Sequence, residues 1–130
     1  MGSFGNYLEN KILDHIFSTA YYSQPILCIA LFQTDPTEAG SGTEVSIVDT
    51  GYNRIRSTDW TISSSGYVYN VATIQFSTAI TTWGTIPYFA IYDSSVSGNM
   101  IAYSSLTTSK TIGIGDSIAF SSGSLSIQLD

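Results

Sequence analysis

The chain has 130 residues, of which 43% are hydrophobic and 11% are charged, and its formal net charge is −6. At this length we expect a single domain spanning residues 1–130, and the hydrophobic content is not that of a disordered chain. Lys and Arg together number four, too few to neutralise a row of phosphates, so we expect no nucleic-acid partner.

The residue types that carry most chemistry are scarce. One cysteine, Cys28, and one histidine, His15, are too few for a disulfide framework, an all-cysteine zinc site or most nucleophile–base pairs. The longest apolar run, residues 26–32, is far shorter than the ~20 residues of a helical membrane span, and the N-terminus lacks the pattern of a signal peptide. We therefore expect a protein made in a cytoplasm, with no enzymatic activity, cofactor, metal or membrane partner.

Residues 4–17 are predicted to form one N-terminal α-helix. Leu8, Ile12 and Ile16 recur every four residues, and the same apolar stripe is widened by Phe4 and Leu13. A helix of this length is marginal in water on its own, so the stripe needs a partner. The partner is the β-domain, a neighbouring copy or another protein.

The ends and the border of this helix carry polar residues. Ser3 or Asn6 is a candidate N-cap. His15 lies at the border of the apolar stripe, and a catalytic base would need a nucleophile and an orienting partner that the helix does not supply. We interpret it as a half-buried histidine at a packing or subunit interface.

Residues 25–130 are predicted to form an antiparallel β-sandwich, giving a mainly β fold. Residues 26–32 are apolar throughout, as in a strand buried on both faces, and Cys28 within them is expected to fill the core. The strand candidates are residues 26–32, 44–48, 52–56, 61–63, 72–76, 87–92, 100–106, 117–120 and 125–129. About eight short strands at fairly regular spacing are typical of a jelly-roll-like sandwich or barrel.

Acidic and aromatic residues leave alternatives open. The loop acids Asp35, Glu38, Glu44 and Asp49 could form a calcium site or a plain solvated loop, and their spacing matches no EF-hand. A pair of carboxylates could also indicate a glycosidase, but any acidic, β-rich chain offers such a pair. A sugar-stacking platform, a protein interface or a packed core would each account for Trp60, Trp83, Tyr67, Tyr69, Tyr88, Tyr92 and Tyr103. We expect the solvated loop and no metal.

Several strings along the chain resemble a known family. They are FGNYLENKILDH at residues 4–15, ALFQTDPTEAGSGTEVS at 30–46, GYNR at 51–54, AITTWG at 79–84, LTTSK at 106–110, GD at 115–116 and LSIQLD at 125–130. The arrangement resembles small tailed-bacteriophage virion proteins, which are often labelled tail fibre proteins and which resemble capsid cement (decoration) proteins in structure. It departs from the family's pattern at residues 47–50, where a shorter, glycine-rich turn is expected.

The resemblance implies a structural protein of the virion, assembled in the host cytoplasm, with no catalytic residues. We expect a capsid cement protein that binds the major capsid protein, because a compact chain without repeats is unlike a long fibre. The alternatives are a tail-associated protein bound to tail proteins and a glycan-binding receptor module. A homo-oligomer, either a trimer or a dimer, is expected. The candidate interface residues are Leu8, Ile12, His15, Ile16, Asp35, Pro36, Thr37, Glu38 and Glu44.

Overall fold

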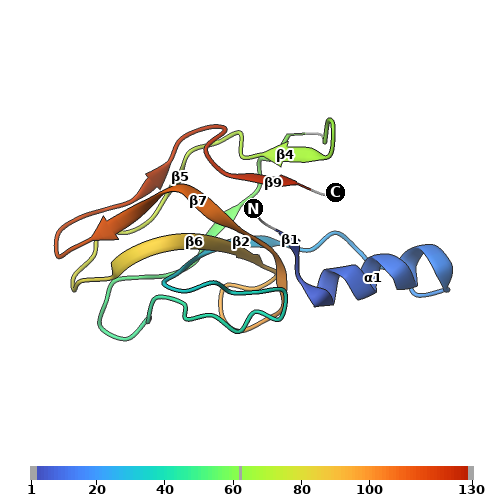
Figure 1. Cartoon of the computed structure of the whole chain (residues 1–130), viewed down its shortest axis with the longest axis horizontal. Helices are drawn as coiled ribbons and strands as arrows, with labels where there is room; N and C mark the ends of the chain where they lie inside the picture. Colours follow the sequence, from blue (N-terminus) through green and yellow to red (C-terminus); the bar gives the residue numbers. More distant parts are fainter. Residues whose placement is uncertain (1–2, 62, 129–130) are drawn as a thin grey trace.

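The computed structural model describes residues 3–61 and 63–128, which form a mainly β fold with one helix (Figure 1). The helix is α1 (Asn6–Phe17). The strands are β1 (Ser3–Phe4), β2 (Leu27–Phe32), β3 (Ile55–Ser57), β4 (Tyr67–Tyr69), β5 (Ile74–Gln75), β6 (Gly84–Tyr92), β7 (Met100–Ile112), β8 (Ala119–Phe120) and β9 (Ser126–Gln128).

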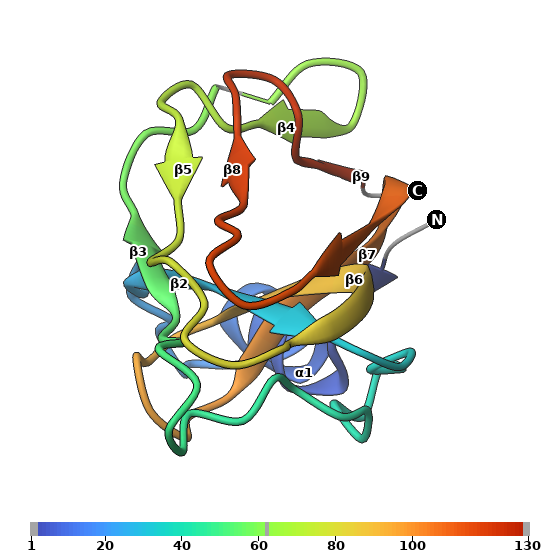
Figure 2. The ribbon, with the colours of Figure 1, turned by 90° about the vertical axis from the view of Figure 1, so that its left-hand side faces the viewer.

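The strands pair into one large sheet and two short ladders. The large sheet has the order β1-β7-β6-β2-β3, and each neighbouring pair is antiparallel. β4 pairs with β9 and β5 with β8, also antiparallel, and Figure 2 shows these ladders facing the large sheet. The predicted antiparallel, sandwich-like fold is confirmed. A jelly-roll arrangement is not, because one layer is a continuous five-stranded sheet and the other is divided into two separate ladders.

Apolar side chains are buried on both faces of the large sheet, and the central strand β2 is apolar in every position. In β2, Ile29 and Leu31 point into the main core, while Ala30 and Phe32 point to the opposite face. The main core also takes residues from α1, β5, β6, β7, β8 and β9. Cys28 is buried as expected, with an exposed fraction of 1%.

Loops, rather than strands, cover the second face. The acidic loop (residues 35–44) lies over it, since a Cβ added at Gly40 would lie 3.6 Å from the Tyr92 hydroxyl and 3.7 Å from the Met100 side chain. The β6–β7 loop, residues 93–99, is held nearby by hydrogen bonds from Arg54 to two of its carbonyls. Polar loops therefore seal an apolar sheet face that would otherwise be in water.

The longest strand, β7, contains a large irregularity in its pairing with β6. Ile86 pairs with Lys110 and Tyr88 pairs with Ser105, so the single residue Pro87 in β6 faces residues 106–109 in β7. Proline has no N–H to donate to the ladder, and strands break their pairing at such positions. The extra residues bend β7 and bring Leu106 against the main core.

Several predicted elements differ from the observed ones. The helix begins at Asn6 rather than at residue 4, because Phe4 belongs to β1. Residues 44–48 form no strand: Glu44 makes a single bridge to Phe32, and the chain then turns away. β4 was not among the predicted strands. Of the predicted strand 61–63, residue 62 lies outside the described residues, as does the end of strand 125–129.

Candidate interaction surface

The start of α1 is fixed to the large sheet by backbone hydrogen bonds. Its N-cap is Gly5, whose N–H donates to a β7 carbonyl at 2.9 Å. A Cβ at this position would lie 2.6 Å from the Met100 carbonyl oxygen, so the close approach requires glycine. The Asn6 N–H donates to the Glu38 carbonyl at 2.9 Å. The predicted side-chain caps, Ser3 and Asn6, are therefore wrong, because a loop carbonyl satisfies the helix N-terminus.

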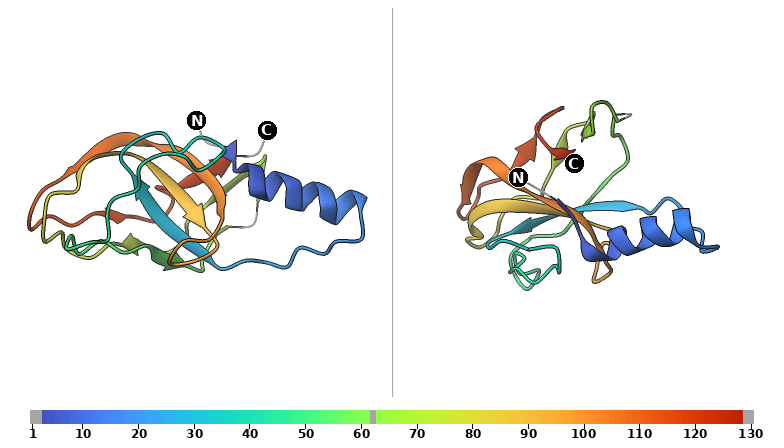
Figure 3. Two further views of the ribbon diagram at one scale, coloured as in Figure 1. Left: turned by 90° about the horizontal axis from the view of Figure 1, so that it is seen from below. Right: turned by 45° about the vertical axis from the view of Figure 1, so that its right-hand side comes forward.

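The two ends of α1 have different surroundings. Leu8 is buried and Ile12 is half-buried against the main core, as the apolar stripe predicted. Beyond them α1 projects past the sheet, as Figure 1 and the left view of Figure 3 show, and Ile16 is 63% exposed. We call the exposed apolar side chains at this end the helix tip; they are Leu13, Ile16, Phe17 and Tyr21.

His15 holds the segment that returns from the helix tip to β2. Its Nδ1 accepts a hydrogen bond from the Tyr22 N–H at 3.3 Å, and its ring meets the Tyr21 ring edge-on at 5.4 Å. Tyr22 in turn packs edge-on against Tyr7. The predicted half-buried position of His15 is wrong, since the residue is exposed. Its observed contacts join two neighbouring segments of the same chain.

The acidic loop brings part of the predicted interface to the start of α1. The Asp35 carboxylate accepts a hydrogen bond from the Thr37 N–H at 2.8 Å, and Pro36 is fully buried. The Glu38 carboxylate accepts one from the Ser3 hydroxyl at 3.0 Å. Glu38 therefore lies beside the helix N-terminus, whereas the side chains of Asp35 and Pro36 support the loop itself.

Glu44 lies apart from these residues in an ion-pair cluster that sequence reasoning missed. Both of its oxygens accept hydrogen bonds from Arg54, at 2.9 and 2.8 Å, and one also accepts from the Tyr52 hydroxyl at 2.7 Å. The Arg54 guanidinium also stacks 3.8 Å above the Tyr92 ring. A signal for this cluster was present in the sequence, because the chain has only four basic residues and one of them, Arg54, lies in the GYNR string. Glu44 thus binds within its own chain.

The electrostatics of this cluster keep Arg54 charged and Tyr52 neutral. Burial, followed by the nearby Glu44 carboxylate, raises the pKa of Tyr52. Burial works against the Arg54 cation, but its hydrogen bond to Glu44 and the charge of that carboxylate outweigh this, so the pKa of Arg54 is raised. The phenol therefore stays a donor to Glu44 while its oxygen accepts the Leu31 N–H at 3.0 Å.

The carboxylates in the described part of the chain do not form a cluster that could bind a metal ion. Among residues 3–61 and 63–128, no group of three His, Cys, Asp or Glu side chains is placed to hold a metal ion. Glu44 is engaged by Arg54, and Asp35 and Glu38 accept the loop hydrogen bonds given above. The absence of a calcium site stays a prediction to be tested in solution.

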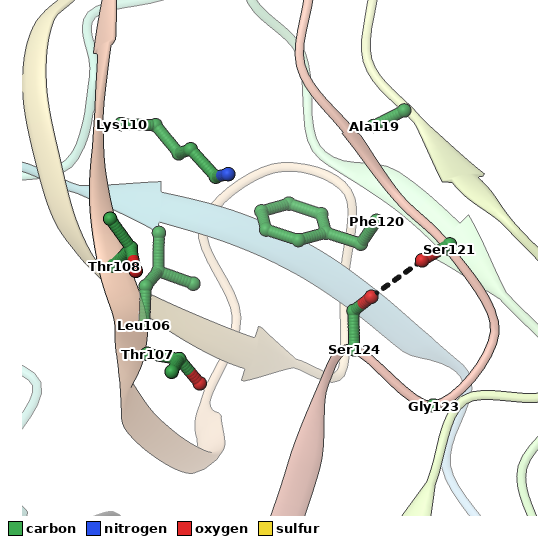
Figure 4. A pocket seen from close by; sticks show the side chains of 9 residues that line it. All are labelled: Leu106, Thr107, Thr108, Lys110, Ala119, Phe120, Ser121, Gly123 and Ser124. Carbon is green, nitrogen blue, oxygen red and sulfur yellow. Dashed lines mark hydrogen bonds between the residues drawn. The ribbon is translucent and has the colours of Figure 1, made fainter.

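A cleft of about 370 Å³ opens between the bulged part of β7 and the β8–β9 connection (Figure 4). Its lining is Leu106, Thr107, Thr108, Lys110, Ala119, Phe120, Ser121, Gly123 and Ser124. The Lys110 ammonium extends across it toward Phe120, and the Ser121 and Ser124 hydroxyls are 2.8 Å apart. The lining contains no Asp, Glu or His, so it supplies none of the groups that most often act as a general acid or base.

The aromatic residues do not gather into one sugar-stacking platform. Trp83 is buried in the main core, whereas Tyr92 packs on the second face with Tyr88 and Tyr103 beside it. Tyr67 and Tyr69 stack on each other in β4, with ring centroids 6.0 Å apart. Most of these rings therefore serve packing within the fold.

The fold is that of a small, mainly β protein whose helix carries an exposed apolar tip. The model of the family described as Podophage GP4 fiber I protein gp80 matches residues 3–128, and the chain belongs to this family. It is thus a bacteriophage structural protein of the fibre type, a component of the virion. No curated protein matches the chain.

The family match bears on the predicted location in the virion. Its description names a fiber protein, which supports the tail-associated alternative better than the capsid cement reading. Neither the match nor the fold supports capsid decoration in particular. In the part of the chain that the structure describes, no helix is long and apolar enough to cross a membrane.

Proposed function

We propose that the protein is a tail-associated structural component of the phage particle, a fibre-type module without enzymatic activity. The observation that carries the proposal is the match of the fiber-protein family model over residues 3–128. Because that match includes both the helix and the β-sandwich, the whole described fold serves the structural role.

Features of the fold support this role. Both faces of the large sheet are packed, one by the short ladders and the other by the acidic loop and the β6–β7 loop. The cleft beside β7 is lined by hydroxyls, one lysine and apolar side chains, without a carboxylate. A rigid body that carries one projecting helix suits a part that is attached to other virion proteins.

The proposal can be tested by separating purified particles into heads and tails. Each fraction is then analysed by quantitative mass spectrometry. We expect peptides of this chain to follow the tail proteins and to be absent from heads identified by the major capsid protein. Recovery with the heads at hundreds of copies per particle would contradict the proposal and favour a cement protein bound to the major capsid protein.

Antibody labelling of intact particles gives an independent measure of the same location. An antibody raised against the folded chain is expected to decorate the tail region in electron micrographs. Labelling spread evenly over the head surface would contradict the tail location, and particles from a deletion strain serve as the control for specificity.

A further inference from the structure

The cleft beside β7 is bounded by two strands that each have an edge without a neighbouring strand. Among the described residues, β1 pairs with β7 only at Ala102 and Tyr103, so β7 has no outer neighbour where residues 106–108 line the cleft. On the opposite wall, in the same part of the chain, β8 pairs with β5 alone, and both of its residues line the cleft (Figure 4). An unpaired strand edge offers backbone N–H and C=O groups to another chain.

The bulge leaves the backbone of β7 unpaired on its inner side as well. Residues 107–109 have no register partner in β6, where Pro87 alone lies opposite the bulge. Within residues 3–61 and 63–128, no backbone hydrogen bond outside the strand ladders involves them either, and all three are exposed. A strand added here would therefore break no existing pair.

The backbone of β8 points toward the cleft at Ala119. In an antiparallel ladder, the backbone groups of successive residues point alternately to one neighbouring strand and to the other. The Phe76 N–H donates to the Ile118 carbonyl at 3.0 Å on the β5 side, so the N–H and C=O of Ala119 point away from β5. Since Ala119 lines the cleft, both walls can hydrogen bond to a strand placed between them.

The lining of the cleft favours a segment that carries a carboxylate. Of the nine lining residues only Lys110 is charged, and its ammonium extends toward Phe120 (Figure 4). It forms no ion pair with any residue that the structure describes. Leu106 and Phe120 add apolar surface beside it. An acidic side chain next to an apolar one would match this arrangement.

We propose that the cleft beside β7 binds an extended, acidic segment of another protein, which adds as a strand between β7 and β8. In such strand addition, main-chain hydrogen bonds supply affinity and the alternate side chains supply selectivity. A segment matching residues 106–110 would have five residues and span roughly 16 Å. The added strand would join the large sheet to the β5–β8 ladder. This inference rests on the purified fold alone, so it goes beyond the proposed tail location and does not depend on it.

Nuclear magnetic resonance of the whole ¹⁵N-labelled chain tests the site. The probe is the peptide acetyl-Thr-Val-Asp-Val-Thr-amide, which has β-branched side chains and one carboxylate. We expect amide shifts confined to residues 106–110 and 119–124, and slower hydrogen exchange at residues 107–109. No response at millimolar peptide, or shifts centred on the β3 edge instead, would overturn the proposal.

A modified peptide tests whether the backbone makes the contact. With N-methyl groups on both valines, the probe keeps every side chain but loses two N–H donors, so we expect the amide shifts to disappear. Because the protein is unchanged, this comparison cannot be confused with a folding defect. Binding of the N-methylated peptide as strong as that of its parent would overturn strand addition.

A lysine variant tests the charge. Lys110→Gln should weaken binding of the aspartate peptide about threefold, as expected for an exposed ion pair, and leave binding of the matching asparagine peptide unchanged. The control Lys11→Gln lies on α1 and should bind both peptides like the wild type. Equal binding of the aspartate peptide by Lys110→Gln and the wild type would overturn the assigned carboxylate contact.

Glucuronate distinguishes strand addition from a sugar site. It offers a carboxylate and hydroxyls but no peptide backbone, so we expect it to leave residues 106–110 unshifted at the same concentration. Shifts of these amides by glucuronate, without a response to the peptide, would overturn the proposal in favour of a sugar site.

Discussion

At the scale of single residues, the Glu44–Arg54 pair does more than join two loops. Arg54 has a side chain only 8% exposed, and it binds the Glu44 carboxylate, the Tyr92 ring and the carbonyls of Ser94 and Ser97. Removing one member of such a pair leaves the other charge unpaired in a poorly hydrated place. The cluster should therefore be a point of high sensitivity in the fold.

Replacement Arg54→Met is expected to lower the free energy of unfolding by about 3 kcal/mol, because it strands the Glu44 carboxylate and two loop carbonyls. Urea denaturation measures the change. The matched control is Arg56→Met, where an exposed arginine two residues away should cost less than about 0.5 kcal/mol. Equal effects of the two substitutions would contradict the assigned role.

The raised pKa of Tyr52 makes the free energy of unfolding depend on pH in the alkaline range. Because its pKa is raised in the folded state, the folded phenol keeps its proton at pH values where an unfolded tyrosine, with a pKa of ~10, loses it. Stability is therefore complete below about pH 10 and falls above it, by about 1.4 kcal/mol per pH unit for this group. Urea titrations at pH 9 to 11 should show a shallower fall for Tyr52→Phe, and an unchanged slope would refute the argument.

At the scale of elements, α1 shows that one amphipathic pattern serves two environments. Its first half packs on the main core through Leu8, and its second half presents the helix tip to solvent. The spacing of Leu8, Ile12 and Ile16 predicted one apolar stripe, but it did not include Phe17 and Tyr21. The available signal was a second stripe, Leu13 and Phe17, with the same four-residue spacing.

Two leucines of α1 separate the two environments experimentally. Leu8→Ala should destabilise the fold by about 2–3 kcal/mol, because it removes a buried side chain and leaves a cavity. Leu13→Ala should change stability by less than about 0.5 kcal/mol in the monomer, since that side chain is 54% exposed. Chemical denaturation measures both.

At the scale of the whole molecule, the main core connects the helix, the large sheet and the short ladders. It includes Leu8 of α1, Leu31 of β2, Ile74 of β5, Phe120 of β8 and Ile127 of β9. A shared core of this kind favours cooperative unfolding. The expectation of one domain over residues 1–130, made from the chain length, stays a prediction.

Unfolding in urea should accordingly be a single transition. Far-ultraviolet circular dichroism follows the sheet, and fluorescence follows Trp83 in the core and the half-buried Trp60. The two curves are expected to coincide, with one midpoint. Two separated transitions would show that the short ladders fold independently of the large sheet.

Calcium should have no effect on the whole fold. A bound ion would stabilise the native state by mass action, whereas the loop carboxylates hydrogen bond within their own chain. We expect the melting temperature to be the same in millimolar calcium and in a chelator. A rise of several degrees with calcium that is lost in Asp35→Ala would reveal a metal site.

The sequence by itself determined the mainly β class, the place of the helix and the burial of Cys28. These follow from local periodicity and from the aliphatic neighbours of each residue. Tertiary structure alone decided which end of α1 packs on the sandwich. It also decided that Arg54 forms an ion pair with Glu44 and that Pro87 lies opposite a bulge in β7. Such features depend on contacts between residues far apart in the chain, such as Arg54 and Ser97, and hydrophobic periodicity carries no information about which distant segments meet.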